Sequence, residues 1–83
     1  MPTSTVEPRP LARHVRTTDD SLTVDLADGR SITVPLVWFP RLAQAEPEAL
    51  ARWEILGDGE GIHWPIADED LSVAGLLAGQ RVP

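Results

Sequence analysis

The chain has 83 residues, no cysteine, and a formal net charge of −6 from 13 acidic residues and seven arginines. A chain of this length closes one hydrophobic core, so we expect a single domain. The lack of cysteine excludes disulfide bonds and thiolate metal sites. No segment approaches the roughly 20 apolar residues that cross a bilayer, and no signal peptide begins the chain, which predicts a cytoplasmic protein without membrane contact.

The first part of the chain is expected to be a tail followed by a strand. Residues 1–10 contain three prolines and no apolar run, so we predict a flexible N-terminal tail. The single α+β domain is expected over residues 11–79, with a short C-terminal tail at 80–83. Its first extended stretch is predicted at 11–17, and a polar turn at 18–21 follows.

A β-hairpin is predicted next. Residues 22–26 and 32–36 each alternate apolar and polar side chains, and an Asp-Gly pair lies between them. A two-residue loop would set the apolar positions of one strand against polar positions of the other. A three-residue loop instead pairs Val24 with Ile32 on one face. We therefore predict the three-residue loop, with Gly29 in the left-handed region.

The second half is predicted to contain short helices and a second hairpin. Helices are expected over residues 37–45 and 47–53, each with a proline in its first turn, where the missing N–H is harmless. Residues 53–56 and 61–64 are strand candidates around a glycine-rich turn. A last helix is predicted after Ser72, a good N-cap. The fold class that follows is α+β, a small antiparallel β-sheet of hairpins packed by two or three short helices.

The negative charge is concentrated in one part of the chain. Residues 1–45 hold five acidic residues and five arginines, whereas residues 46–70 hold eight acidic residues against Arg52 alone. Such a segment repels phosphate, so direct nucleic-acid binding is not expected. Two interpretations stay open, a solvated acidic surface and a face for a partner protein with a basic surface. The acidic residues are Glu46, Glu48, Glu54, Asp58, Glu60, Asp68, Glu69 and Asp70.

The aromatic side chains are expected mainly in the core. Trp38 and Phe39 are adjacent, and a short helix can hardly bury both. One of them is therefore expected at the surface beside Arg41, where an aromatic–arginine pair would anchor a protein interface. Trp53 and Trp64 are expected to pack inside.

One cluster has the residue types for a metal site or an acid–base pair. His63 stands near Asp68, Glu69 and Asp70. The structural alternative places the three acidic residues before the last helix, where negative charge is favourable. A zinc site normally needs further ligands, and His14 is the only other imidazole, so no metal and no cofactor is predicted. The chain also has no cysteine or lysine nucleophile and no Gly-x-Ser-x-Gly motif, so it is not predicted to be an enzyme.

A spaced series of short motifs extends over nearly the whole expected domain. The motifs are Asp-Gly-Arg at 28–30, Val-Pro-Leu at 34–36, Phe-Pro-Arg-Leu at 39–42, Gly-Ile-His-Trp-Pro at 61–65, Asp-Glu-Asp-Leu-Ser-Val at 68–73 and Leu-Leu at 76–77. With this series the chain resembles a widespread bacterial family, domain-of-unknown-function family 2442. The resemblance implies a compact α+β fold with a small antiparallel sheet packed by helices, and it supplies no catalytic residues.

The resemblance also implies a genetic setting. Relatives are often encoded beside a second small protein in toxin–antitoxin-like pairs, and some carry a helix-turn-helix domain after this one. Because the chain ends at Pro83, no such DNA-binding domain is expected in it.

Three functions follow as hypotheses. The preferred one is a non-catalytic, antitoxin-like protein-binding module that neutralises or regulates a partner protein. The first alternative is an acidic inhibitor that imitates nucleic acid, as anti-CRISPR proteins do. The second is a metal-assisted hydrolase centred on His63 with Asp68 or Asp70. An open edge of so small a sheet could in addition pair two copies into a homodimer.

Overall fold

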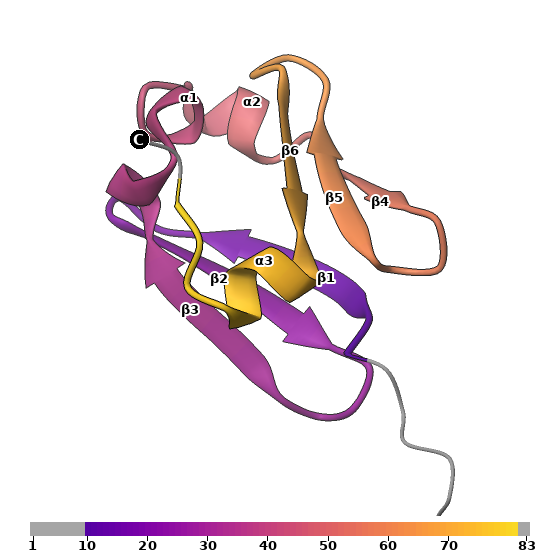
Figure 1. The fold of residues 1–83 in the computed structure, drawn as a ribbon. Helices are drawn as coiled ribbons and strands as arrows, with labels where there is room; N and C mark the ends of the chain where they lie inside the picture. Colours follow the sequence, from indigo (N-terminus) through magenta and orange to yellow (C-terminus); the bar gives the residue numbers. More distant parts are fainter. Residues whose placement is uncertain (1–9, 82–83) are drawn as a thin grey trace, which may run out of the picture.

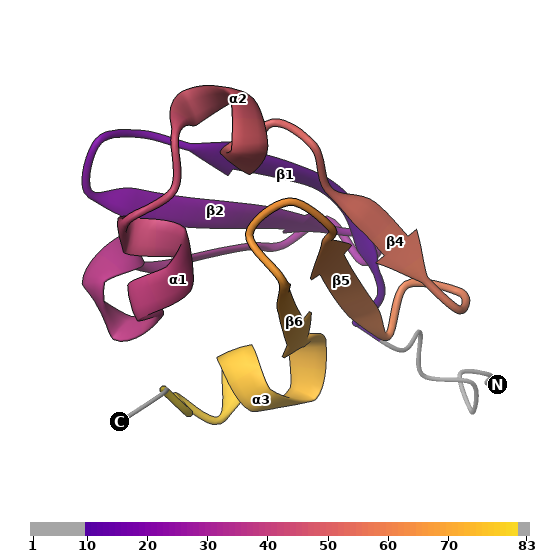
Figure 2. The same ribbon diagram turned by 90° about the horizontal axis from the view of Figure 1, so that it is seen from above.

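The computed structural model describes residues 10–81, which form two three-stranded antiparallel sheets with short helices. The predicted N-terminal tail lies outside the described residues, apart from Pro10. The elements in chain order are β1 (Ala12–Thr17), β2 (Ser21–Leu26), β3 (Ser31–Pro35), the 3-10 helix η1 (Leu36–Trp38), α1 (Pro40–Ala43), α2 (Pro47–Leu50), β4 (Glu54–Leu56), β5 (Gly61–Trp64), β6 (Glu69–Ser72) and α3 (Val73–Leu77). The second sheet and α3 lie over one face of the first sheet (Figures 1 and 2).

The first sheet has the order β1-β2-β3 and contains the predicted hairpin. Val24 pairs with Ile32, as the three-residue loop requires. The backbone N–H of Leu26 donates to the oxygen of Arg30 at 2.8 Å across that loop, and Gly29 has a φ of +96°. The register and the left-handed glycine are therefore confirmed.

The prediction of one helix over residues 37–45 is wrong. The chain forms η1 and α1 instead, separated by Phe39 in an extended conformation with φ of −126° and ψ of 91°. The cause is Pro40, because the ring of a proline disfavours helical geometry in the residue before it. The break turns the Phe39 side chain into the core, where it is buried.

Two further boundaries differ from the predicted ones. The helix expected over residues 47–53 ends at Leu50, so α2 is a single turn. The strand expected to reach Leu36 ends at Pro35, and Leu36 begins η1. Both differences fall at element ends, where local sequence signals are weakest.

The second sheet has the order β4-β5-β6. The predicted second hairpin is confirmed, with Ile55 opposite Ile62 in β4 and β5. Strand β6 is a correction, because Asp68, Glu69 and Asp70 were expected as a charged approach to the last helix. The segment instead turns back along β5, so that Trp64 pairs with Glu69, and α3 starts only after that strand.

The last helix begins where it was predicted. The Ser72 hydroxyl oxygen accepts a hydrogen bond from the backbone N–H of Gly75 at 2.9 Å, the standard N-cap arrangement. Leu71 and Leu76 flank this cap in sequence, and both are buried in the core. Within residues 10–81 no helix is long and apolar enough to cross a membrane.

The core lies between the two sheets and is organised around Trp64, whose side chain is completely buried. Its ring Nε1–H donates to the backbone oxygen of Leu50 at 3.2 Å, so burial of the indole leaves no donor unpaired. The same core cluster contains apolar side chains from both sheets and from α1 and α3. The other fully buried large side chains are Leu22, Val24, Leu42, Ile62 and Val73.

Candidate functional site

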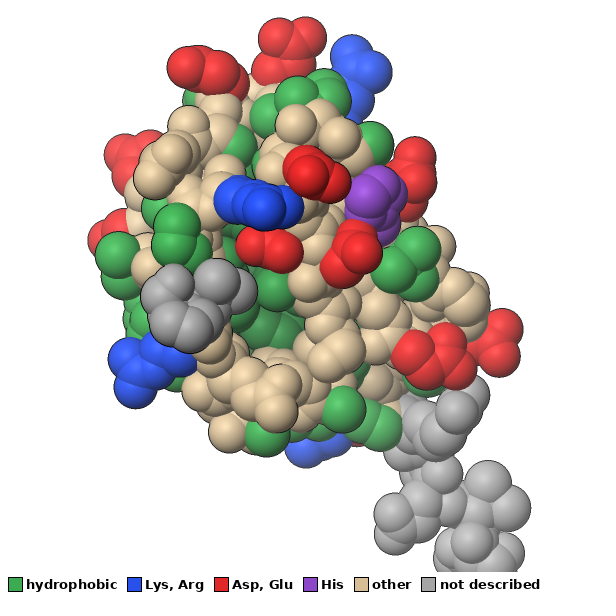
Figure 3. Space-filling view, turned by 45° about the horizontal axis from the view of Figure 1, so that its top comes forward, with side chains coloured by type: hydrophobic (Ala, Val, Ile, Leu, Met, Phe, Trp, Pro, Cys, Tyr) green, Lys and Arg blue, Asp and Glu red, His purple; other side chains and the backbone are tan. Residues whose placement is uncertain are grey.

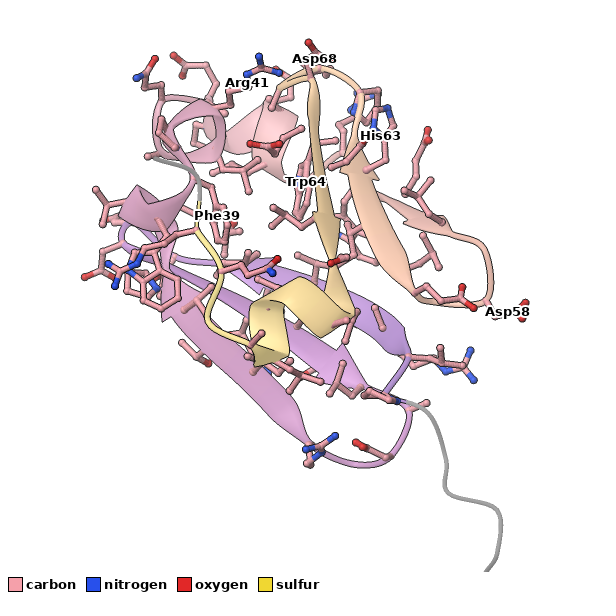
Figure 4. All side chains as sticks on the ribbon, viewed as in Figure 1. Phe39, Arg41, Asp58, His63, Trp64 and Asp68 are labelled. Carbon is pink, nitrogen blue, oxygen red and sulfur yellow. The ribbon has the colours of Figure 1, made fainter. Side chains whose placement is uncertain are left out.

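A row of three ionisable side chains crosses the outer face of the second sheet. Strand pairing sets Glu54 opposite His63, and His63 opposite Asp70. Directly opposed residues on neighbouring strands project to the same side of a sheet. Trp64, the next residue of β5, projects to the other side and into the core (Figure 4). The row therefore faces away from the core, and the backbone pairing fixes it.

His63 is the centre of this row. Its ring Nδ1 is hydrogen-bonded to the Asp70 carboxylate. This hydrogen bond raises the pKa of His63 above its ordinary value, and the negative charges of Asp70, Glu54 and Asp68 add to the effect, while partial burial opposes it. The local environment thus favours a cation at this position.

Asp68 lies outside the row, at the turn between β5 and β6, but its charge is among those that raise the pKa of His63. It has a φ of +58°, a left-handed conformation that Asp tolerates better than most residues. Arg41 of α1 donates through Nη1 to the backbone oxygen of Asp68 and, at 3.3 Å, to its carboxylate. Arg41, His63 and Asp68 therefore lie at the same end of the molecule (Figure 4).

We call Glu54, His63, Asp68 and Asp70 the acidic face. The Asp68 and Asp70 side chains are 86% and 69% exposed, so a partner could reach both carboxylates. Figure 3 shows acidic side chains gathered on this side of the molecule, with basic side chains among them.

The other predicted acidic residues do not join this face. Asp58 lies at the tip of the β4–β5 hairpin, far from Asp68 (Figure 4). The backbone N–H of Asp58 donates a hydrogen bond to the Glu60 carboxylate at 2.8 Å. Glu46 precedes α2 and Glu48 lies in it, with the Glu48 carboxylate 4.0 Å from Arg52. The segment that is continuous in sequence is thus divided into separate groups in space.

Glu69 has a local role at the edge of the second sheet. Its carboxylate accepts a hydrogen bond from the backbone N–H of Asp70 at 3.0 Å. Its side chain is paired with the neighbouring backbone, and the residue itself is half-buried.

The predicted surface pair of Trp38 and Arg41 is wrong. The guanidinium of Arg81 lies 4.7 Å from the centroid of the Trp38 ring, whereas Arg41 binds Asp68. Phe39 is buried and Trp38 is half-buried against the core, so the expectation that only one of the two is fully buried is confirmed. The contact between Trp38 and Arg81 joins residues far apart in sequence, so no local sequence pattern predicts it.

A groove beside the acidic face was not predicted from the sequence. It has a volume of about 600 Å³ and runs along β6, with α3 and the segment after it on the other side. Figure 3 shows the surface hollowed here, with apolar side chains inside the hollow. Its lining includes Phe39, Gly61, Asp70, Ser72, Leu76 and Arg81. These residues come from five parts of the chain, so only the tertiary structure assembles the groove.

Comparison with known proteins places this architecture in a family. The model of the family described as "Protein of unknown function (DUF2442)" matches residues 12–82. The chain belongs to this family. The resemblance inferred from the spaced motifs is therefore confirmed.

Two solved structures are similar to this DUF2442 member. A protein of unknown function from Rhodospirillum rubrum is 35% identical, with a TM-score of 0.78 over 92% of this chain and 94% of that one. An uncharacterized protein from Chromobacterium violaceum is 29% identical, with a TM-score of 0.73 over 88% of this chain and 69% of that one. The comparison with curated proteins gives no match.

The geometry of this family member bears on the metal hypothesis. Among residues 10–81, no three His, Asp or Glu side chains are arranged to hold a metal ion. His63 and Asp70 form a hydrogen-bonded pair on an open sheet surface, without a second imidazole beside them. His14 packs its ring edge-to-face against Trp53 instead, with centroids 5.3 Å apart.

Proposed function

We propose that this protein is a non-catalytic binding module that neutralises or regulates a partner protein, and that its acidic face docks on a basic surface of that partner. The observation that carries the proposal is the cross-strand row of Glu54, His63 and Asp70. Because backbone pairing holds the row, its charges are presented in a fixed pattern rather than on a flexible loop. A fixed pattern is what electrostatic recognition needs to orient a partner.

The charge balance of the acidic face supports a basic partner. Among the described residues, Arg41 is the arginine that contacts it, and Arg41 is paired with Asp68. Glu54 and Asp70 lie on either side of His63, and both carboxylates contribute to raising its pKa. Even with His63 protonated and Arg41 paired to Asp68, the three carboxylates of the acidic face outnumber these two cations, so a lysine or arginine of a partner is still attracted.

Imitation of nucleic acid receives less support from the geometry. A mimic needs carboxylates spread along one surface at phosphate-like spacing, and Asp58 and Asp68 lie at opposite ends of the second sheet (Figure 4). The metal-assisted hydrolase lacks a set of converging ligands in residues 10–81. We therefore base the proposal on protein binding alone.

The test is affinity capture from the native host with the full chain as bait, followed by mass spectrometry. Two variants are matched in charge, Glu54→Lys on the acidic face and Asp19→Lys in the β1–β2 turn. We expect the parent and Asp19→Lys to recover the same partner, and Glu54→Lys to lose it. Recovery should also fall as salt rises, because exposed charges are screened over about 10 Å at 0.1 M ionic strength. Equal recovery by both variants would contradict the proposal.

A further inference from the structure

The outer edge of β6 offers two backbone groups to a further strand, the C=O of Asp70 and the N–H of Ser72. Strand β6 is an edge strand, with β5 on one side only. The backbone N–H of Val73 donates to the oxygen of Glu60 at 2.9 Å, which makes these two residues a hydrogen-bonded pair of the antiparallel ladder. Bonded and non-bonded pairs alternate, so the N–H and C=O groups of Asp70 and Ser72 point away from β5. The Asp70 N–H is bonded to the Glu69 carboxylate, and the C=O of Ser72, as the N-cap of α3, accepts the first bond of that helix. The Asp70 C=O and the Ser72 N–H are the two that a further strand meets.

The side chain of Glu69 supports this assignment. Its carboxylate accepts the backbone N–H of Asp70, which is one of the outward groups. A side chain from the same strand thus covers part of the edge in the way an added strand would. Covering an edge by a local charged side chain is one way in which proteins prevent uncontrolled strand pairing.

The groove lies along this edge and has two kinds of wall. Leu76 and Phe39 supply apolar surface, and Asp70 and Glu60 supply carboxylates. Its volume of about 600 Å³ is within the usual range for ligand pockets, about 300–1,000 Å³. A groove beside a free strand edge is the arrangement that binds an extended peptide, with main-chain bonds giving affinity and side-chain pockets giving specificity.

The charge of β6 argues against a second copy of this chain as the occupant. Two β6 strands side by side would bring Glu69 and Asp70 of each copy together, and like charges across a strand pair are destabilising. A partner strand with a basic side chain would instead place opposite charges across the strand pair, which is stabilising. The homodimer is therefore an outcome of the test and not the expected one.

We infer that β6 captures an extended segment of the partner protein as a fourth strand, with a lysine or arginine of that segment opposite Asp70. This inference rests on the proposed function and names the form of its partner. The basic side chain would share the outer face with Asp70, since opposed residues project to the same side. The next residue of the segment would project inward over Leu76 and Phe39 and should be apolar. Arg81 also lines the groove, and its positive charge disfavours a second basic residue of the segment close to it.

The probe is a fluorescein-labelled nonapeptide in which valine and threonine alternate around one arginine, and its control carries glutamate in place of the arginine. Binding to the full chain is measured by fluorescence anisotropy and by amide NMR. We expect the arginine peptide to bind at least about tenfold more tightly than the glutamate peptide. The Ser72 amide should shift and exchange more slowly when the peptide is bound, since it gains a main-chain acceptor.

A charge-reversal variant adds an independent readout. Asp70→Lys should lower the affinity for the arginine peptide and raise the affinity for the glutamate peptide. Asp19→Lys makes the same change in net charge and should alter neither affinity. Equal affinity for the two peptides, no binding up to about 1 mM, or self-association of the chain through β6 would overturn the inference.

The two proposals fail in different ways. If Glu54→Lys abolishes partner capture while the Ser72 amide is unaffected by partner or peptide, the acidic face is the docking site and strand addition is wrong. If neither Glu54→Lys nor Asp70→Lys changes partner capture, the proposed function itself is wrong.

Discussion

The backbone N–H of Ala12 donates a hydrogen bond to the carbonyl oxygen of Gly59 across 2.7 Å. This bond joins the start of β1 in the first sheet to the β4–β5 turn of the second. Gly59 has a φ of +121°, and a Cβ built on it would lie 2.8 Å from the oxygen of Ala12. The contact between the two sheets therefore requires a residue without a side chain at position 59.

Substitution of Gly59 by alanine should destabilise the protein strongly. The backbone conformation alone costs a residue with a side chain about 1–3 kcal/mol, and the clash with β1 adds to that. Urea unfolding followed by tryptophan fluorescence measures the loss. Gly29→Ala is the matched control, because Gly29 also has a positive φ but open space around it. If both variants lose the same free energy of unfolding, the close contact between Gly59 and β1 does not require glycine.

Trp64→Phe should remove a hydrogen bond from the core while keeping an aromatic ring. The Leu50 oxygen would lose the Nε1–H donor, and a buried acceptor left unpaired costs about 1–3 kcal/mol. The free energy of unfolding from thermal or urea denaturation measures this. Trp53→Phe, at a half-buried position, should cost less. A larger loss for Trp53→Phe would show that the indole of Trp64 is not central to the core.

Ser72→Ala should destabilise α3 through loss of its N-cap. The expected cost is about 1 kcal/mol, since the Gly75 N–H loses its acceptor. Ser72→Thr keeps a capping hydroxyl and should retain most of the stability, and equilibrium unfolding compares the two variants. If Ser72→Thr is as unstable as Ser72→Ala, the hydroxyl does not act as a cap.

The titration of His63 should depend on Asp70. Because the pKa of His63 is raised in the folded protein, its protonation stabilises the fold. The contribution is complete below the ordinary histidine pKa of about 6.5 and is lost as the pH rises through the raised pKa of the folded state. Asp70→Asn should lower the pKa of His63 in an NMR titration, since the largest cause of the shift is removed. Asp19→Asn is the control and should leave the pKa of His63 unchanged. If the pKa of His63 is also unchanged in Asp70→Asn, Asp70 and His63 do not form the pair.

The amino-acid sequence determined several parts of this fold by itself. The register of the first hairpin follows from period-two alternation, because only the three-residue loop places Val24 beside Ile32. The start of α3 follows from Ser72, because its hydroxyl accepts a hydrogen bond from the backbone N–H of Gly75, only three residues further along the chain. The family also follows from the sequence, because its motifs are spaced along the whole domain. In each case the determining interaction is local or strictly periodic.

The contacts of the charged residues depend on long-range packing. Strand β6 contains one buried residue, Leu71, so no periodicity distinguished it from a loop before the helix. Arg41 meets Asp68, and Arg81 meets Trp38, because α1 and the end of the chain are brought to them by packing. Exposed charges carry no hydrophobic signal, so their partners depend on where the core places the backbone. The acidic face and the groove beside β6 are consequences of that placement.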